Sequence, residues 1–589
     1  MDDLVRRFVR PDMHLHFAAT LSRPNALIYA VARVLRGAGR LTVSTTAVHS
    51  SAHALALSGA VRHVESCFFG DTYPSPRPNR IYRDLAVGLP FTAQTWSLLS
   101  YTQRLVAGAT GTPYAVTASL AGSDLTRGKE ADLWSVPDPA VPGGHVTLLR
   151  PMRPDLTLVH GVCADRRGNV VLCAPLGEGP WAAYAATGGV LASVERIVPD
   201  EVVDAHPDRV VIPGQRVIGL AEAELGAHPQ SLRSQGVGGV TGYRDDYDFM
   251  TEIVRDCADA DTAEEWFRTW VTEPGGHDGY LKALGRERIE ALALDHTAPE
   301  RDGADRDVET AGGQPKPTTK QATEPVTEPP TEQERLLVLA ARAIIAQVET
   351  GGYDTLLAGI GSSHMAAWLA AALLRERGRP VRVAAELGFF GMDPEPGDVF
   401  LFSQAHAQRS EQLSSILEIL GAQVAGNRRC LGVLAAAEVD EEGNLNTTLL
   451  PDGRWVTGSG GANDIASTAD CLVVAPASPR RYVPRVCYVT SPGHRVREVV
   501  SQFGRFQRPG PGEPFQLRSW LPTPKTDVTA GPEGPEGPEG PDGPDTPDEL
   551  IARHTRWTVK PAGDARPEPD ITPAELALLR RLDPEGHYR

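Results

Sequence analysis

The sequence predicts an α/β protein made of two related open-sheet halves that are joined by a disordered linker. Three observations support this prediction. Short apolar runs alternate with helix-favouring segments in both parts of the chain, two motifs recur in the same order in each part, and a stretch with almost no aromatic or large aliphatic residues separates the parts. The length of 589 residues is sufficient for several folding units of ordinary size.

Composition and charge are those of a soluble globular protein, with 41% hydrophobic and 23% charged residues. The net charge of −17 argues against non-specific binding to nucleic acid or to an anionic membrane surface. No apolar run approaches the ~18 residues of a membrane-spanning helix, and the first 20 residues lack the apolar stretch of a secretory signal. The seven cysteines have no CxxC spacing, which favours reduced thiols over a disulfide framework or a metal site. These features predict a cytoplasmic protein without a bound metal.

Two segments of unusual composition divide the chain. Residues 296–333 are rich in Pro, Thr, Glu and Asp and are expected to form a flexible linker, because they cannot bury enough apolar surface to offset the entropy of ordering. Residues 521–548, which contain the run GPEGPEGPEGPDGPD, are expected to form a disordered insert rich in Gly, Pro and acidic residues. The two predicted halves then span residues 1–295 and 334–520, and residues 549–589 form a helical extension of the second half.

Local patterns predict particular elements in the second half. Residues 354–358 and 381–385 are short apolar runs that predict strands, and the Ala- and Leu-rich residues 365–377 between them predict a helix. Strands joined through a helix in this way should be parallel, with a right-handed connection. Near the C-terminus, Thr572 and Glu575 have the spacing of a capping box at a helix start.

The two halves repeat one another in sequence. Residues 64–70 (VESCFFG) align with residues 385–391 (AELGFFG), and residues 164–170 (ADRRGNV) align with residues 439–445 (VDEEGNL). The order of the two motifs is the same in both halves. We therefore expect a duplicated α/β unit with extra elements inserted in the first copy.

Glu386 is the first candidate for chemistry, because it follows directly on a predicted parallel strand. Sites in open parallel sheets form beyond the carboxyl ends of the strands, and the glycines at 388 and 391 allow a substrate to approach closely. The alternative is a solvated glutamate in a loop. Glu65 occupies the aligned position in the first half and is the rival candidate.

A second candidate is the glycine-dense loop of residues 458–464 (GSGGAND). Successive small residues can present backbone N–H groups as an anion nest or an oxyanion hole, but the same composition also suits an ordinary tight turn. Residues 359–361 (GIG) also follow a predicted strand. They lack the third glycine and the acidic partner of a dinucleotide-binding motif, so they do not predict a nicotinamide cofactor.

Further motifs in both halves carry a resemblance to a known family. These motifs are residues 13–17 and 22–26, 155–160, 164–170 and 279–285 in the first half, and residues 359–361, 386–388, 439–447 and 458–466 in the second. In them the chain resembles class I CoA-transferases of the glutaconate CoA-transferase type, with the α and β subunits fused in one polypeptide. The loop GSGGANDIA is the most specific of these matches, and together they cover most of both halves.

The resemblance implies a reaction and roles for individual residues. It implies that Glu386 attacks an acyl-CoA and passes through an anhydride to a glutamyl-CoA thioester, from which a carboxylic acid takes the CoA. Acyl-CoA and a carboxylic acid are then the substrates, coenzyme A is a substrate rather than a permanently bound cofactor, and a homo-oligomer is an expected assembly. The loop residues expected to bind the oxyanion or the substrate are Gly460, Gly461, Ala462 and Asn463. Candidates for the substrate pocket, in or beside the matched motifs, are Gly361, Gly388, Glu438 and Asn25, and Glu438 is expected to raise the pKa of Glu386.

Two alternatives to CoA transfer stay open at this point. One is a hydrolase of the same fold that cleaves a CoA thioester or a C–C bond in a CoA-linked intermediate. The other is a non-catalytic relative that binds acyl-CoA or serves as a scaffold. A transferase stops without an acceptor acid and a hydrolase does not, so dependence on the acceptor separates the two enzymes.

Overall fold

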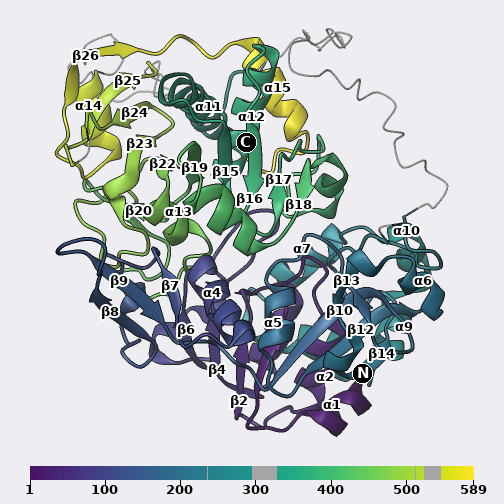
Figure 1. Ribbon diagram of the computed structural model, residues 1–589. Coiled ribbons are helices and arrows are strands. Elements are labelled where there is room, and N and C mark those ends of the chain that lie inside the picture. Colours follow the sequence, from purple (N-terminus) through teal and green to yellow (C-terminus); the bar gives the residue numbers. More distant parts are fainter. Residues whose placement is uncertain (235, 295–327, 511, 523–545) are drawn as a thin grey trace.

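The computed structural model describes residues 1–234, 236–294, 328–510, 512–522 and 546–589 (Figure 1). Most of the predicted linker and of the predicted acidic insert lies outside these described residues. Each half of the chain is built on its own large, mainly parallel sheet, with the first half purple to teal and the second half green to yellow in Figure 1. The predicted class, two α/β halves with open sheets, is confirmed.

The sheet of the first half runs in the order β13-β11-β10-β1-β2-β4-β6, and β12 pairs with β10 and carries β14. The pairs along β14-β12-β10-β1-β2-β4-β6 are all parallel. All nine residues of the central strand β10 are buried, as expected of a parallel strand that is covered on both faces. The strands are β1 (His14–Phe17), β2 (Leu41–Ser44), β4 (Val61–Ser66), β6 (Thr92–Thr95), β10 (Leu156–Ala164), β11 (Val170–Val171), β12 (Val190–Ile197), β13 (Val210–Ile212) and β14 (Val217–Glu222).

The sheet of the second half runs in the order β18-β17-β16-β15-β19-β22-β23-β24-β25-β26. Its centre, β16-β15-β19-β22-β23, is parallel, and β17, β18, β24 and β25 extend it by antiparallel pairing. The strands are β15 (Thr355–Ala358), β16 (Arg382–Ala385), β17 (Phe389–Phe390), β18 (Gln412–Leu413), β19 (Cys430–Leu434), β22 (Asp470–Val474), β23 (Val496–Val500), β24 (Gly504–Gln507), β25 (Gln516–Trp520) and β26 (Pro561–Pro567).

Helices and small sheets complete both halves. The first half contains α1 (Asp2–Phe8), α2 (Asn25–Val34), α3 (His53–Leu57), α4 (Leu98–Thr110), α5 (Gly179–Ala185), α6 (Asp200–Asp204), α7 (Tyr247–Asp256), α8 (Ala260–Phe267), α9 (His277–Leu284) and α10 (Arg286–Leu292). The second half contains α11 (Glu332–Gly351), α12 (Ser362–Glu376), α13 (Ala462–Thr468), α14 (Pro547–His554), α15 (Pro573–Leu582) and a π-helical segment, η10 (Leu417–Ala425). The small sheets are β3 (Ala47–Val48) with β5 (Phe68–Phe69), β7 (Ala115–Thr117) with β9 (His145–Leu149) and β8 (Leu133–Pro137), and β20 (Glu438–Val439) with β21 (Leu445–Asn446).

The internal repeat is visible in the hairpins that follow the central strands. In the first half, Asp165 accepts hydrogen bonds from the backbone and side-chain nitrogens of Asn169 at 2.8 and 2.7 Å. In the second half, Asp440 accepts the same two bonds from Asn444 at 2.8 and 3.2 Å. The same turn chemistry therefore closes both hairpins.

The sheet topology extends this repeat, with one difference. The unit β15-α12-β16 is parallel, as predicted, and β1-α2-β2 has the same arrangement in the first half. The next strand beyond β2 is the parallel strand β4, whereas the next strand beyond β16 is the antiparallel strand β17. Glu65, at the end of β4, therefore has a different topological position from Glu386, although the sequences around the two residues align.

The boundaries predicted around the two atypical segments need correction. Helix α11 begins at Glu332, inside the predicted linker, because Thr331 and Glu334 form a capping box there. Helix α14 likewise begins at Pro547, inside the predicted insert. The C-terminal extension is not purely helical, since β26 pairs with β25 at the edge of the sheet. The capping box predicted for α15 is present.

The two halves share one apolar core around α4 of the first half. Buried residues of α4 and its preceding loop, such as Trp96 and Leu105, belong to the same cluster as Leu420 of η10 and Ile465 of α13. Backbone contacts add to this packing, because Phe68 and Gly458 form an isolated bridge across the junction. The halves are therefore held in a fixed relation by packing of apolar side chains.

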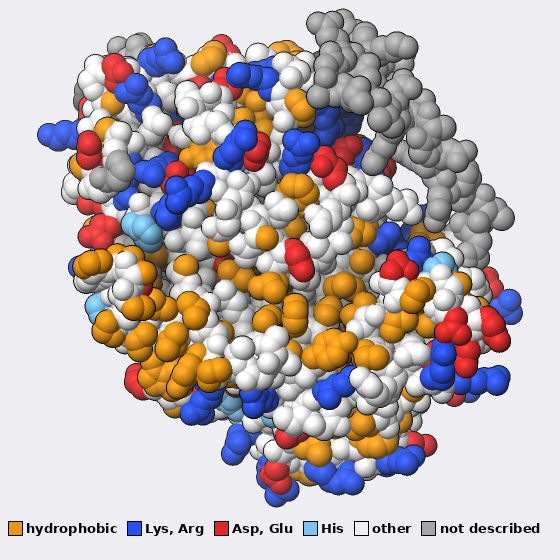
Figure 2. All heavy atoms as spheres, in the orientation of Figure 1, with side chains coloured by type: hydrophobic (Ala, Val, Ile, Leu, Met, Phe, Trp, Pro, Cys, Tyr) orange, Lys and Arg blue, Asp and Glu red, His pale blue; other side chains and the backbone are white. Residues whose placement is uncertain are grey.

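The surface in Figure 2 shows apolar side chains gathered over the small sheet of β7, β8 and β9. The exposed residues there include Tyr114, Val116 and Val141. All seven cysteines are free thiols, and six of them are buried while Cys487 is exposed. Among the described residues, every helix is too short or too polar to span a bilayer.

Candidate active site

A cavity of about 840 Å³ lies between the two halves. Its walls are loops that follow the carboxyl ends of β1 and β2 in the first half and of β15, β16 and β19 in the second, together with the glycine-dense loop. This is the edge at which ligands bind in open parallel sheets, and the volume is ordinary for a small-molecule site. The carboxyl ends of the parallel strands in both sheets thus face one cavity.

Glu386 lies in this cavity, in the second-half wall directly after β16. Its carboxylate oxygen Oε2 accepts a hydrogen bond from the backbone N–H of Gly461 at 3.1 Å. Burial, and then the charge of Asp464, raise the pKa of Glu386 to about 7, and the Gly461 bond acts in the opposite direction. A carboxylate with a raised pKa is a stronger base, and hence a better nucleophile, than an ordinary surface glutamate, while a large fraction is still ionised near neutral pH.

The backbone amides of the glycine-dense loop have different partners from those predicted. Only Gly461 directs its N–H at Glu386, because Gly460 donates to the carbonyl of Cys67 and Ala462 donates to the carbonyl of Ser459. Asn463 is buried; its side-chain oxygen accepts from Leu120 N–H and its amide nitrogen donates to the carbonyl of Thr490. One amide of the loop, that of Gly461, thus contacts Glu386 directly, while the other two hold the loop in place. Gly460, Gly461 and Ala462 all line the cavity, and their binding of an oxyanion or a substrate stays a prediction.

The second carboxylate near Glu386 is Asp464 and not Glu438. Asp464 is buried in the first turn of α13 and accepts the N–H of Leu99 at 2.8 Å, and burial raises its pKa to about 6. Glu438 also lines the cavity, but it accepts a hydrogen bond from Asn446 and is not among the groups that shift the pKa of Glu386. The sequence could have indicated Asp464 through its position three residues after Gly461, whose N–H donates to Glu386.

Known proteins resemble both halves of the chain. Residues 1–222 match the family model described as Coenzyme A transferase. A 3-oxoadipate CoA-transferase subunit from Pseudomonas knackmussii is 33% identical over 172 residues, which are 28% of this chain and 54% of that protein. A glutaconate CoA-transferase subunit from Acidaminococcus fermentans is 36% identical over 69 residues, 11% of this chain and 26% of that protein. The first 222 residues are therefore similar to the Coenzyme A transferase family, and shorter segments of the chain are similar to CoA-transferase subunits.

The match to these curated relatives is partial in length. The chain spans about half of the Pseudomonas protein and a quarter of the Acidaminococcus protein. A solved structure of an acyl-CoA transferase from Escherichia coli O157:H7 aligns over 96% of this chain and 94% of that chain, with a TM-score of 0.61 and 14% identity. At that identity the likeness shows a common fold that covers both halves and the junction between them.

The remaining pocket candidates separate into those that reach the cavity and those that do not. Gly361, like Glu438, lines it, and the positive φ of +107° at Gly361 suits only glycine at the turn after β15. Gly388 is not among the lining residues, because it packs against the carbonyl of Ser414, where a Cβ would approach to 2.4 Å. The absence of a side chain at Gly388 lets two backbone segments approach closely.

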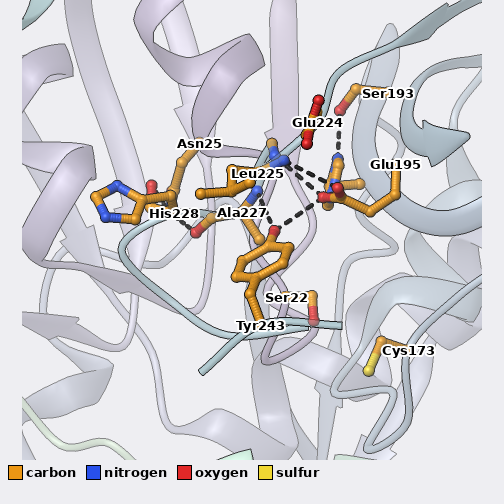
Figure 3. Close-up of polar contacts among 12 residues, drawn as sticks. Ser22, Asn25, Cys173, Ser193, Glu195, Glu224, Leu225, Ala227, His228 and Tyr243 are labelled. Carbon is orange, nitrogen blue, oxygen red and sulfur yellow. Dashed lines mark hydrogen bonds and ion pairs between the residues drawn. The ribbon is translucent and has the colours of Figure 1, made fainter. Parts of the chain in front are cut away.

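Asn25, a predicted pocket residue, also lies outside the residues that line the cavity. Its amide nitrogen donates to the carbonyl oxygens of Ala227 and His228 at 2.7 and 3.2 Å. Figure 3 shows that this contact adjoins a second buried network, in which Glu195 accepts from Tyr243 at 2.9 Å. Asn25 therefore fixes the start of α2 to a buried loop, a structural role that its motif did not reveal.

Glu65, the rival of Glu386, has a structural partner. It forms an ion pair with Arg104, whose guanidinium stacks on Trp96 at 4.1 Å from the ring centroid, and it is not among the residues that line the cavity. Burial acts to raise the pKa of Glu65, but Arg104 and His14 outweigh it and hold the pKa below its ordinary value. Within the described residues, no group of three or more His, Cys, Asp or Glu side chains is placed to hold a metal ion.

Substitution Glu65→Gln should therefore reduce the stability of the protein more than its rate of CoA transfer. Loss of the charge leaves the guanidinium of Arg104 buried and unpaired, which costs roughly 3 kcal/mol of unfolding free energy. Urea unfolding measures this change, with Glu264→Gln as the control, because Glu264 pairs with Arg36 at the surface and should cost under ~1 kcal/mol. Equal losses in the two variants, or complete loss of activity in folded Glu65→Gln, would contradict the structural assignment of Glu65.

Proposed function

We propose that this protein transfers coenzyme A from an acyl-CoA to a carboxylic acid, with Glu386 as the covalent nucleophile and with two fused subunit-like halves forming one site. The observation that carries the proposal is the pairing of Glu386 with the Gly461 amide in a cavity that both halves line. The match of residues 1–222 to the Coenzyme A transferase family model supports the reaction class, and the relatives of this chain include subunits A and B of a glutaconate CoA-transferase.

The first stage of the proposed reaction begins with attack of a Glu386 carboxylate oxygen on the thioester carbonyl carbon of the acyl-CoA. Collapse of the tetrahedral intermediate expels CoA thiolate and leaves an acyl-glutamyl anhydride. The thiolate then attacks the Glu386 carbonyl carbon, the bond to the acyl oxygen breaks, and the acid leaves as its carboxylate. The product on the protein is a glutamyl-CoA thioester, and no proton has been transferred.

The second stage of the reaction reverses these steps with the acceptor acid. The acceptor carboxylate attacks the glutamyl thioester and releases thiolate, which then attacks the acceptor carbonyl of the new anhydride and frees Glu386. Each tetrahedral intermediate at the Glu386 carbonyl carbon carries its negative charge on an oxygen of that side chain. The Gly461 N–H already contacts Oε2 in the resting state, so this donor is in place to stabilise that charge without reorganisation.

Water is the main competitor, because it would hydrolyse both the anhydride and the thioester. The position of Glu386 between the halves, with the apolar side chains of Leu387 and Phe68 among the lining residues, supports transfer over hydrolysis, since apolar contacts next to the nucleophile disfavour ordered water. The direct test is incubation with acetyl-CoA, with and without propionate, followed by chromatography of the CoA esters. We expect propionyl-CoA to appear at the expense of acetyl-CoA. Free CoA produced at the same rate without propionate would favour the hydrolase instead.

The pH profile should identify the ionised nucleophile. Because burial and Asp464 raise the pKa of Glu386 to about 7, kcat/KM for the acyl-CoA should fall as pH drops through 7, where protonation removes the attacking carboxylate. Asp464→Asn removes the neighbouring charge while keeping an oxygen for the Leu99 N–H, so it should move this acid limb to lower pH. Stopped assays from pH 5 to 9 measure both profiles, and an unmoved limb would contradict coupling of the two carboxylates.

A further inference from the structure

Helix α4 of the first half begins against the glycine-dense loop of the second half. Leu98 is the first residue of this helix and follows Ser97, whose backbone is extended. The first N–H groups of a helix have no partner within the helix, and they lie at its positive end. The Leu98 N–H donates to the carbonyl of Gly460 at 3.0 Å. A free N–H group at the start of α4 is therefore used by the loop beside Glu386.

The peptide group between Gly460 and Gly461 connects this contact to the nucleophile. Its carbonyl, that of Gly460, accepts the Leu98 N–H, and its N–H, that of Gly461, donates to Glu386 Oε2 at 3.1 Å. A peptide group is planar, so a bond that fixes the carbonyl also fixes the direction of the N–H. Hydrogen bonds in series polarise one another, so the Leu98 bond also makes the Gly461 N–H a stronger donor.

The next N–H group of α4 holds the carboxylate that lies near Glu386. The Leu99 N–H donates to Asp464 Oδ2 at 2.8 Å, and the charge of Asp464 acts to raise the pKa of Glu386. The other titratable group that faces Glu386 is the buried thiol of Cys67, whose pKa burial raises well above its ordinary value, so it is uncharged. Two successive N–H groups of one helix thus contact the donor and the charged neighbour of the nucleophile.

Further bonds from the first half hold the loop in this orientation. The N–H of Gly460 donates to the carbonyl of Cys67 at 3.0 Å, so both backbone groups of Gly460 are bound by the first half. The Leu120 N–H donates to Asn463 Oδ1 at 2.8 Å, and the Asn463 side chain is fully buried. The first half therefore sets the orientation of the loop that contacts the second-half glutamate.

We propose that Leu98 is a positioning residue for CoA transfer: its backbone N–H, in the first half, orients and polarises the Gly460–Gly461 peptide group that donates to Glu386 in the second half. This inference rests on the proposed function, because it assigns a further contact to the same reaction. It gives the first half of the chain a defined part in the chemistry, through its backbone and independently of substrate binding.

The test removes this N–H group alone. The α-hydroxy analogue of leucine, introduced at position 98, replaces the amide by an ester and keeps the side chain. We expect kcat to fall by about 10-fold, with KM for the acyl-CoA little changed. The same analogue at Leu294 is the control, because the Leu294 N–H donates to the carbonyl of Gly242 at 2.9 Å and neither residue lines the cavity. Both esters should lower the thermal midpoint alike, and only the ester at 98 should lower kcat.

Substitution Leu98→Ala separates the backbone from the side chain, because it keeps the N–H and shortens only the buried side chain. It should leave the pKa of Glu386 unchanged. The ester at 98 should raise that pKa, since the Gly461 bond acts to lower it, and the acid limb of kcat should move to higher pH.

Infrared difference titration of the Glu386 carboxyl group, taken against Glu386→Gln, measures this pKa without any CoA ester. A raised pKa in the ester at 98 supports the proposal even if CoA transfer fails. An unchanged pKa of Glu386 in that ester, or equal losses of kcat in the esters at 98 and 294, would overturn it, because that pattern indicates a purely structural bond. CoA transfer at a normal rate in the ester at 98 would overturn this inference alone.

Discussion

Substitution Glu386→Gln is expected to abolish CoA transfer while the protein stays folded. The amide has nearly the shape of the carboxylate and can still accept the N–H of Gly461, but it cannot attack a thioester or carry CoA. Removal of a covalent nucleophile costs on the order of 10⁵ to 10⁶ in kcat, so residual transfer should be close to background. Steady-state formation of the new CoA ester measures the loss.

The stability of Glu386→Gln should depend on pH in a defined direction. The pKa of Glu386 is raised from 4.5 to about 7 in the folded protein, so its ionisation opposes folding as pH rises between these two values. The variant should therefore gain stability over the unmodified protein at pH 8 and match it more closely at pH 4.5. Glu411→Gln, an exposed glutamate of the same half, is the control for both activity and stability. Full activity in folded Glu386→Gln would remove Glu386 from the chemistry.

Substitution Gly461→Ala is expected to produce the second-largest loss of activity. A Cβ at position 461 would lie 2.1 Å from Oε2 of Glu386, which is closer than any stable contact. The glutamate must therefore move away, and it loses the hydrogen bond from the Gly461 N–H. Displacement of the nucleophile together with loss of an oxyanion donor should reduce kcat by on the order of 10²- to 10³-fold. Rates of CoA transfer and the thermal midpoint, measured together, separate this effect from unfolding.

Gly563→Ala is the matched control for the glycine substitution. Gly563 lies in β26, and a Cβ there would meet nothing within 4 Å, so both activity and thermal midpoint should be nearly unchanged. If Gly461→Ala retained normal activity, the close contact between the glycine loop and Glu386 would have no part in catalysis. Such a result would also mean that a methyl group fits at position 461, in disagreement with the close contact to Glu386.

The sequence predicted the class of fold because its signals were local. The apolar runs of β15 and β16 and the Ala-rich helix between them depend on neighbouring residues, and each was found where predicted. The capping residues of α15 were also correct. The predicted end of the linker was less accurate, because it was drawn from composition alone, whereas the capping box of Thr331 and Glu334 starts α11 inside that segment.

The sequence predicted the position of a site residue only where that residue directly follows the carboxyl end of a strand. Glu386 follows β16 directly, so its place at the sheet edge follows from topology. Asp464 was missed as the charged neighbour of Glu386, because its position depends on burial against the first half, which no local sequence pattern reports. Asn25 and Gly388 lie in matched motifs, but their long-range contacts with residues 227 and 414 place them outside the residues that line the cavity.

The most direct test of the central claim is a chemical trap of the covalent intermediate. The protein is incubated with a set of short acyl-CoAs and treated with borohydride, which reduces a glutamyl-CoA thioester to the corresponding alcohol. It is then digested and analysed by mass spectrometry. We predict a reduced residue at Glu386 that is absent from Glu386→Gln and present in Glu65→Gln. An unreduced Glu386 in protein that is transferring CoA at full rate, or the reduced residue at any other position, would contradict the account.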